Sequence, residues 1–330
     1  MTAISLVATA GYLPEAVIDN AFFGGDPTHR RGMFKGSQYR RHVAPGETAV
    51  SMFEKAAGKL RDRLGSAAIK EVDLVLTNAS CPDSPFTGCG AALTHTLGIK
   101  PKWVLDLHNT GCVAFVYMLG VARELMASGS VKSALLCCAQ TAAGRVFNHP
   151  ENRVRPQSSV PGDGCGVGYV VANDSAPIRG FVSHTHGEYA NDMSVKTDEG
   201  AQYWEPHRSA MYIDFTESRV AEIVHRGNKL VPEVVRAACK AAEITEKQID
   251  LLVTNQPNSV FLRNWREALL VPKEAQVETY EEYGNLFGAA IPINIERAAE
   301  QGRLKKGMRV ALGGFAHAGD YAAAAIWEPA

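Results

Sequence analysis

The apolar positions of this chain follow two periodicities, and together they predict an α/β protein. In segment 49–64 the apolar side chains share one helical stripe, whereas segments 72–78 and 133–139 are nearly continuous apolar runs. Such runs are typical of strands covered on both faces by helices. The apolar N-terminal segment also reads as a strand, and a further helix is expected to begin near Cys112.

The same order of elements recurs 177 positions later, which indicates two duplicated halves. The second half predicts a helix over 230–244, a strand over 249–255, a helix over 289–300 and a strand over 309–315. A polar, proline-containing stretch at 173–177 separates halves of residues 1–175 and 176–330. The residues that carry the repeat are Asp73 and Asp250, Gly111 and Gly288, and Ala134 and Ala311.

Composition narrows the function classes. The 330 residues are 46% hydrophobic, and 34 Lys and Arg balance 35 Asp and Glu, for a net charge of −1. The hydrophobic fraction excludes a disordered protein. The balanced charge provides no overall positive potential that would attract nucleic acid or a membrane surface. The longest apolar run, 112–122, is too short to span a membrane, and the N-terminus lacks the positive region of a signal peptide. We therefore expect a cytoplasmic protein.

The seven cysteines are scattered and show no zinc-ligand spacing, so no metal is expected and most thiols are expected to be reduced core residues. Cys112 differs, because it follows a predicted strand and a tight turn and begins an almost wholly apolar helix. There the helix dipole should lower the pKa of the thiol, and the N–H of Cys112 could donate to an oxyanion. The alternative reading is a core cysteine.

Asparagines occupy two other turns that the repeat relates to this one. The loop equivalent to the Cys112 turn contains Asn285, which should lie beside Cys112 if the halves pack about a pseudo-twofold axis. Asn255 follows the repeated strand at the sheet edge where sites form, although Asn255–Asn258 read alone is only a turn.

Glycines and histidines supply the remaining candidates. Backbone at Gly313 or Gly314 could provide a second oxyanion donor, and His317 nearby is a candidate for proton transfer. His186, with its neighbour His184, is a similar candidate, although an isolated histidine is more often a surface residue. The glycine-rich segment 162–168 lacks the pattern of a phosphate loop and is expected to pack tightly beside the site.

These segments resemble the thiolase superfamily, and most of all its β-ketoacyl-acyl carrier protein synthase III branch. The motifs are NTGCVAFVYML from Asn109, GDGCGVGYV from Gly162, YGNLFGAAIP from Tyr283 and GGFAHAG from Gly313. The resemblance implies a five-layered αβαβα fold, a homodimer and no cofactor. It also implies that Cys112 is the acylated nucleophile, that Asn285 is the catalytic asparagine, and that Phe86 is a dimer contact closing a neighbouring acyl tunnel.

The chain departs from the family at two points. Asn255 stands where the family has a catalytic histidine, which puts decarboxylative condensation in question because an amide cannot exchange protons. The family's cationic contact to coenzyme A has no clear match in segment 34–38, so an acyl carrier protein is at least as well suited a donor as coenzyme A.

Three functional hypotheses follow. The first is a ketoacyl synthase III-type acyltransferase of polyketide or fatty-acyl biosynthesis, which loads Cys112 from a thioester and condenses the acyl group with a malonyl-type extender. The second is non-condensing transfer of that acyl group to a hydroxyl or amine. The third is a non-catalytic partner subunit of an active homologue, against which the retained cysteine argues.

Overall fold

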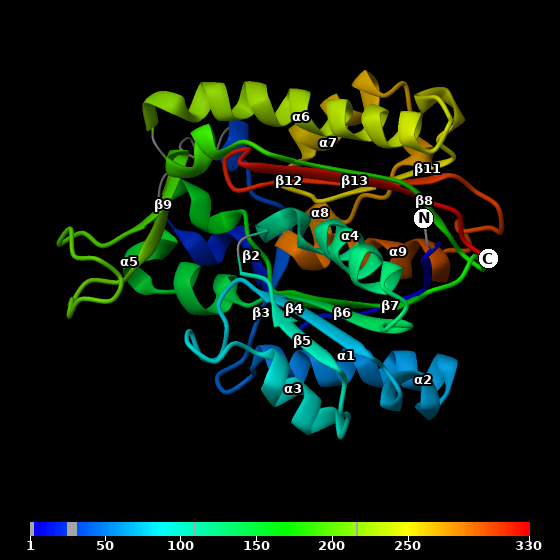
Figure 1. The fold of residues 1–330 in the computed structure, drawn as a ribbon. Coiled ribbons are helices and arrows are strands. Elements are labelled where there is room, and N and C mark those ends of the chain that lie inside the picture. Colours follow the sequence, from blue (N-terminus) through cyan, green and yellow to red (C-terminus); the bar gives the residue numbers. More distant parts are fainter. Residues whose placement is uncertain (1–2, 25–31, 109, 216) are drawn as a thin grey trace.

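The computed structural model describes residues 3–24, 32–108, 110–215 and 217–330, which form two large sheets, two smaller two-stranded sheets and three layers of helices (Figure 1). The first sheet has the strand order β1-β7-β6-β4-β5 and the second the order β8-β13-β12-β11. The strands are β1 Ser5–Tyr12, β4 Leu74–Ala79, β5 Trp103–Asp106, β6 Ser133–Gln140, β7 Gly164–Val171, β8 Ile178–Thr185, β11 Leu251–Thr254, β12 Val310–Ala316 and β13 Tyr321–Trp327.

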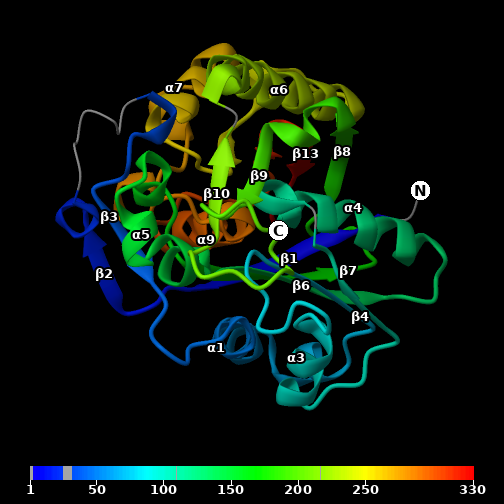
Figure 2. The same cartoon turned by 90° about the vertical axis from the view of Figure 1, so that its left-hand side faces the viewer.

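The helices lie outside and between the two sheets. Helices α1, α2 and α3 cover the outer face of the first sheet, α6 and α7 cover the second, and α4 and α9 run between them (Figures 1 and 2). This is the predicted five-layered αβαβα arrangement. The helices are α1 Ala49–Leu64, α2 Ser66–Lys70, α3 Gly90–Leu97, α4 Ala114–Ala127, α5 Pro150–Arg153, α6 Val220–Ala241, α7 Ser259–Ala268, α8 Tyr280–Tyr283 and α9 Ala290–Glu300.

The two sheets share a topology. The central pairs β4–β6 and β11–β12 are parallel, and the pairs β6–β7 and β12–β13 are antiparallel. The chain passes from one sheet to the other between the end of β7 and the start of β8, where the predicted division of the sequence lies. Two hairpins stand apart from the sheets, β2 Ala16–Asp19 with β3 Tyr39–His42 and β9 Met193–Lys196 with β10 Tyr212–Phe215.

The core is layered in the same way. The largest apolar cluster lies between the sheets around α4 and α9, and each outer helical layer packs a cluster of its own. Because α4 and α9 are enclosed on both sides, they are apolar over most of their circumference. This explains why the sequence between Cys112 and Ala122 is an uninterrupted apolar run although it spans no membrane.

The predicted elements agree with the structure except at the start of the long second-half helix. That helix was expected at 230–244, but α6 begins ten residues earlier, at Val220, and ends at Ala241. The apolar stripe does extend into the first turns, where Ile223 and Gly227 are buried. It is narrower there than in the later turns, and a glycine and several charged residues weaken the helical pattern of the sequence.

The glycine-rich segment packs tightly, as predicted. A Cβ on Gly162 would overlap the carbonyl oxygen of Tyr283, and one on Gly166 would overlap the ring of Pro292. Cys165 within this segment is buried in the core. These close approaches bring β7 against the loop that carries Asn285.

Candidate active site

A cavity of about 340 Å³ opens where the two halves of the chain meet, and Cys112 is in its wall. The side chains around it are mainly apolar and aromatic. Among the described residues that line it there is no Lys, Arg, Asp or Glu. Its polar lining is Asn78, Ser80, Cys81, His108, Cys112, Gln157, Tyr212, Asn255, Asn285 and His317.

Cys112 is placed by a turn between β5 and α4. Gly111 has a positive φ of 42°, which a glycine adopts without strain, and residues Gly111–Val113 form a 3-10 turn that leads into α4. The Cys112 side chain is half-buried and faces the cavity. Asn109, the first residue of the predicted motif, lies outside the described residues.

Asn285 is held at the same point by its backbone. Its N–H donates to the carbonyl of Val160 at 2.9 Å, and its own carbonyl accepts from the N–H of Gly162 at 3.1 Å. Its Oδ1 accepts from the N–H of Phe287 at 3.0 Å. With Oδ1 engaged in this way, the Nδ2 group is the one directed to the Cys112 sulfur, to which Asn285 makes a hydrogen bond.

Asn255 reaches the sulfur from the end of β11. Its Oδ1 accepts from the N–H of Phe315 at 3.3 Å, and its Nδ2 donates to the carbonyl of the same residue at 3.2 Å. The second Nδ2 hydrogen remains for the hydrogen bond that Asn255 makes to Cys112. The structure thus brings together the cysteine and both asparagines that the sequence singled out.

The electrostatic expectation for Cys112 is wrong. Burial raises the pKa of its thiol to about 12, although the amides of Asn285 and Asn255 and the N–H of Cys112 itself lower it. The carboxylate of Asp320 raises that pKa further. The cost of placing a thiolate in an apolar cavity exceeds what these hydrogen-bond donors supply. The thiol of Cys112 is therefore neutral at pH 7.

Gly313 and Gly314 do not line the cavity. They lie within β12, between β11 and β13, and a Cβ on Gly314 would meet the side chain of Asn255. Because β12 continues to Ala316, the chain reaches the cavity at Phe315 and His317 instead. The oxyanion donor expected at the two glycines is therefore not found there.

The two candidate histidines are placed differently. His317 lines the cavity, and its Nδ1 is 2.9 Å and 3.0 Å from the two carboxylate oxygens of Asp320. His186 does not line the cavity; its ring packs on Tyr189, with ring centroids 5.8 Å apart, and near His184. Only the backbone of His186 approaches the site, because its N–H donates to the carbonyl of Asp320 at 2.7 Å.

The sequence reasoning missed one wall of the cavity, the β9–β10 hairpin, which contributes Met193, Val195 and the residues from Met211 to Ile213. The alternation of Met211, Ile213 and Phe215 is a strand signal that could have revealed it. His108 and Asp320 were missed as well, and neither has a local pattern that distinguishes it from a surface residue.

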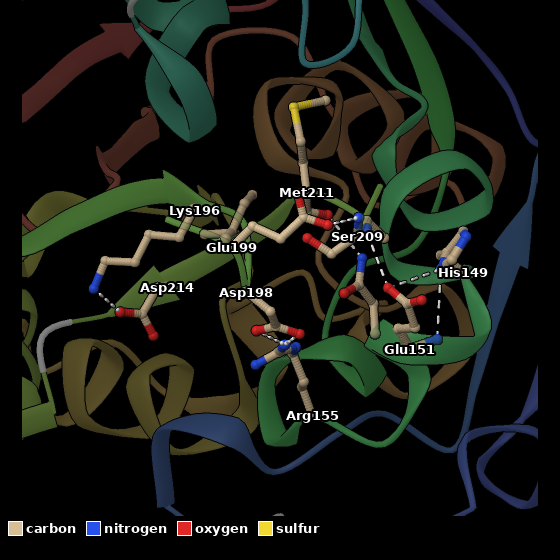
Figure 3. A network of polar contacts seen from close by, with 12 residues as sticks. His149, Glu151, Arg155, Lys196, Asp198, Glu199, Ser209, Met211 and Asp214 are labelled. Atoms are coloured by element: carbon tan, nitrogen blue, oxygen red, sulfur yellow. Dashed lines mark hydrogen bonds and ion pairs between the residues drawn. The ribbon is translucent and has the colours of Figure 1, made fainter. Parts of the chain in front are cut away.

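Polar contacts fasten this hairpin to the body of the protein (Figure 3). Lys196 pairs with Asp214 across the hairpin at 2.6 Å, and Arg155 holds Asp198 at 2.8 Å. The carboxylates of Glu199 and Glu151 accept N–H groups from the segment that leads into β10, and the amide of Asn152 donates to the carbonyl of Met211 at 2.8 Å. The apolar wall is thus positioned by a network on its outer side.

No group of His, Cys, Asp or Glu among the described residues is arranged to hold a metal ion. No helix within the described ranges is both long and apolar enough to cross a membrane. Phe86, the predicted dimer contact, is 98% exposed on the segment between β4 and α3.

The fold and the cysteine-centred cavity define a thiolase-like protein, and comparison with known proteins gives the family. Residues 105–187 match the profile of 3-oxoacyl-[acyl-carrier-protein] synthase III, and residues 239–328 match the profile of its C-terminal part. Together the two regions cover just over half of the chain. The chain belongs to the 3-oxoacyl-[acyl-carrier-protein] synthase III family, an acyltransferase family, as its motifs predicted.

Relatives match along nearly the whole length. The β-ketoacyl-[acyl-carrier-protein] synthase III of Alkalilimnicola ehrlichii is 27% identical and covers 96% of each chain. A second enzyme of that name, from Deinococcus radiodurans, is 28% identical over 98% of this chain and 94% of its own. Among solved structures, the synthase III of Thermus thermophilus superposes with a TM-score of 0.83, at 25% identity over 99% of both chains.

Proposed function

We propose that this chain is an acyltransferase of the ketoacyl synthase III type that carries its acyl group on Cys112. The observation that carries the proposal is the position of the Cys112 sulfur, which faces the cavity and receives hydrogen bonds from the amides of Asn255 and Asn285. A core cysteine needs neither an opening nor two converging donors. The arrangement supplies a nucleophile and a set of donors for a thioester carbonyl.

In the proposed reaction the sulfur of Cys112 attacks the carbonyl of an acyl thioester. The N–H of Cys112 stabilises the oxyanion, and the donor thiol leaves. The uncharged, largely apolar cavity suits an uncharged acyl chain, and its cysteine lies where that chain would be attached. The relatives are named for an acyl carrier protein, which with coenzyme A is the donor we propose.

The acyl group is then condensed with a malonyl-type extender, in fatty-acyl or polyketide assembly. In this step Asn255 and Asn285 donate to the extender's thioester carbonyl as carbon dioxide is lost and the carbanion forms. The amides can stabilise that enolate without accepting a proton. The carbanion attacks the acyl carbonyl, the bond between that carbon and the Cys112 sulfur breaks, and the cysteine leaves as the thiolate, with the β-ketoacyl thioester as product. We further propose a cytoplasmic homodimer, in which the exposed side chain of Phe86 is a subunit contact.

Intact-mass spectrometry tests the first step. The wild-type protein incubated with acyl-N-acetylcysteamine thioesters, acyl coenzyme A or acyl carrier protein should gain the mass of one acyl group. The variant Cys112→Ala should gain none, and Cys239→Ala, which removes a buried thiol of α6, should be acylated like the wild type. Acylation of Cys112→Ala would refute the nucleophile. No acylation of the wild type, together with co-purification of a homologous subunit, would favour the non-catalytic partner.

A second candidate, non-condensing transfer to a hydroxyl or amine, is favoured by the identity of residue 255. Asn255 is committed to the backbone of Phe315 and cannot act as an acid or base there. Product analysis separates the two reactions: condensation releases one carbon dioxide per acyl group and forms a β-ketoacyl thioester, whereas transfer forms an ester or amide without carbon dioxide.

A further inference from the structure

The proposed acyl transfer requires a proton acceptor that the two asparagines do not provide. The thiol of Cys112 is neutral in the cavity because burial raises its pKa to about 12. An amide side chain does not accept a proton at neutral pH, so Asn255 and Asn285 can orient the sulfur but cannot deprotonate it. The following inference rests on the proposed function and identifies the missing base.

Few described residues around the cavity can take up a proton near neutral pH. The lining contains two imidazoles, His108 and His317, and no carboxylate or amine. His108 is exposed to solvent. His317 is half-buried, with 27% of its side chain exposed, and it has a carboxylate partner. The two histidines thus differ in how firmly the ring is held.

The backbone of His317 and a carboxylate partner together fix the orientation of its ring. The turn between β12 and β13 holds it at a φ of 49°, a region that non-glycine residues seldom occupy. The carboxylate of Asp320 accepts the Nδ1 proton at 2.9 Å, which leaves the lone pair on Nε2. Nε2 faces the residue before the nucleophile, since a Cβ on Gly111 would lie 2.8 Å from it.

The side chains described next lie around this pair and do not compete with His317 for the carboxylate of Asp320. The guanidinium of Arg226 lies near the turn, 3.4 Å from the position of a Cβ on Gly319, and pairs with Asp192 at 2.6 Å. On the other side the ring of Tyr321 meets that of His317 edge to face, with centroids 6.1 Å apart. Asp320 also lies near enough to Cys112 for its charge to raise the pKa of the thiol.

We propose that His317, oriented by Asp320, is the proton-transfer residue of this site and performs the acid–base work that Asn255 cannot. As the sulfur–carbon bond to the acyl group forms, the Cys112 proton moves to Nε2. The bond between the acyl carbon and the donor sulfur breaks, and the departing thiolate takes the proton from the imidazolium. The histidine is neutral again when the acyl group is on Cys112.

The same histidine can also take the proton of a hydroxyl or amine acceptor in the second step. As the oxygen or nitrogen of a hydroxyl or amine attacks the acyl-Cys112 carbonyl, its proton passes to Nε2 and then to the departing Cys112 thiolate. The loss of carbon dioxide from a malonyl group needs no such base. The pair His317–Asp320 thus acts in the acylation of Cys112, whichever acceptor follows. It acts again in the second step when the acceptor is a hydroxyl or an amine.

The rate of Cys112 acylation by an acyl-N-acetylcysteamine thioester, followed by rapid mixing and intact mass, tests the role. His317→Gln and His317→Gly should be acylated about 10²- to 10⁴-fold more slowly than the wild type. Asp320→Asn should be slowed by a smaller factor, at least about ten-fold, because the ring loses its orienting carboxylate. His95→Gln, on the exposed face of α3, is the matched control and should be unchanged.

Imidazole rescue separates proton transfer from a structural role. A glycine accepts the positive φ of position 317 without strain, so His317→Gly should fold, and removal of the ring leaves space beside Gly111. Free imidazole should accelerate acylation of His317→Gly and leave His317→Gln unaffected. The wild-type rate should also level off with rising pH, whereas that of His317→Gln should keep rising with the thiolate fraction.

The proposal is overturned if His317→Gly is acylated at the wild-type rate, or if it is slowed but imidazole does not restore it. It is also overturned if His108→Gln, and not His317→Gln, removes the plateau of the pH profile. These outcomes leave Cys112 acylation in the wild type intact and so do not affect the proposed function. If the wild type is never acylated, the proposed function fails and this role fails with it.

Discussion

Gly288 packs against the carbonyl oxygen of Gly111, at the point where the two halves of the chain meet. A Cβ on Gly288 would lie 2.9 Å from that oxygen and 3.0 Å from the Cβ of Ala114. The two glycines are the repeat-related pair, and each lies in the turn before a central helix. Their contact brings the turn of Asn285 against the turn of Cys112.

Replacing Gly288 with alanine should therefore disturb the site and the fold together. The added methyl group has no room beside backbone, and we expect Gly288→Ala to lose about 1–3 kcal/mol of unfolding free energy and to acylate Cys112 more slowly. Chemical denaturation and intact mass measure both effects. Gly58→Ala is the control, since a Cβ there meets nothing closer than 3.7 Å within α1, and it should be neutral or stabilising. A fully stable, active Gly288→Ala would contradict the close packing.

The raised pKa of Cys112 predicts how its alkylation depends on pH. With the proposed base removed in His317→Gln only the thiolate reacts, so the rate of this variant with iodoacetamide should rise about ten-fold per pH unit between pH 7 and 10 without levelling off. Peptide mapping follows the Cys112 peptide among the seven cysteines. In urea the same peptide should level off near pH 9, as an unperturbed thiol does. A plateau below pH 8 in the folded protein would show that the helix terminus outweighs burial.

Loss of the Asn255 side chain should cost stability as well as activity. Asn255→Ala leaves the buried N–H and carbonyl of Phe315 without their side-chain partner, which should lower the unfolding free energy by about 1–3 kcal/mol. Urea denaturation measures this loss. Asn264→Ala removes a hydrogen bond to the half-exposed side chain of Asn228 and should cost less. Equal losses would mean that the contacts to Phe315 are not structural.

Substituting histidine for Asn255 tests whether the native reaction is a condensation. An imidazole at the end of β11 could polarise a malonyl carbonyl, so Asn255→His should release carbon dioxide from a malonyl thioester faster than the wild type. Release of labelled carbon dioxide gives the rate. If acylation of Cys112 persists but decarboxylation does not increase, a hydroxyl or amine acceptor is favoured.

The exposed ring of Phe86 predicts a subunit contact. A phenylalanine that is 98% exposed in the monomer gains most by burial against a second chain. Phe86→Asp should shift a dimer toward the monomer in analytical ultracentrifugation. Trp204→Asp alters another exposed aromatic residue, in the loop beyond β9, and should leave the dimer intact. A monomeric wild type, or dissociation by Trp204→Asp alone, would contradict the assignment.

Much of the architecture was predictable because local patterns of apolar residues indicate its elements. The apolar stripe of α1 and the apolar runs of β4 and β6 each reflect burial of a single element. The repeat relates Gly111 to Gly288, and a pseudo-twofold arrangement of the halves then predicts that Asn285 lies beside Cys112. The first turns of α6 escaped detection because their apolar stripe is narrow, with Ile223 and Gly227 buried among charged residues.

The sequence by itself determined the order of the elements and the duplication, and it singled out the cysteine and the two asparagines that we propose for the site. Only the tertiary structure decided that His317 rather than His186 borders the cavity, that Asp320 holds its ring, and that burial keeps Cys112 protonated. The physical reason is the separation along the chain over which each kind of interaction acts. Periodicity and turn chemistry act between neighbours along the chain, whereas a cavity wall, a carboxylate partner and a desolvation cost depend on segments that meet only after folding.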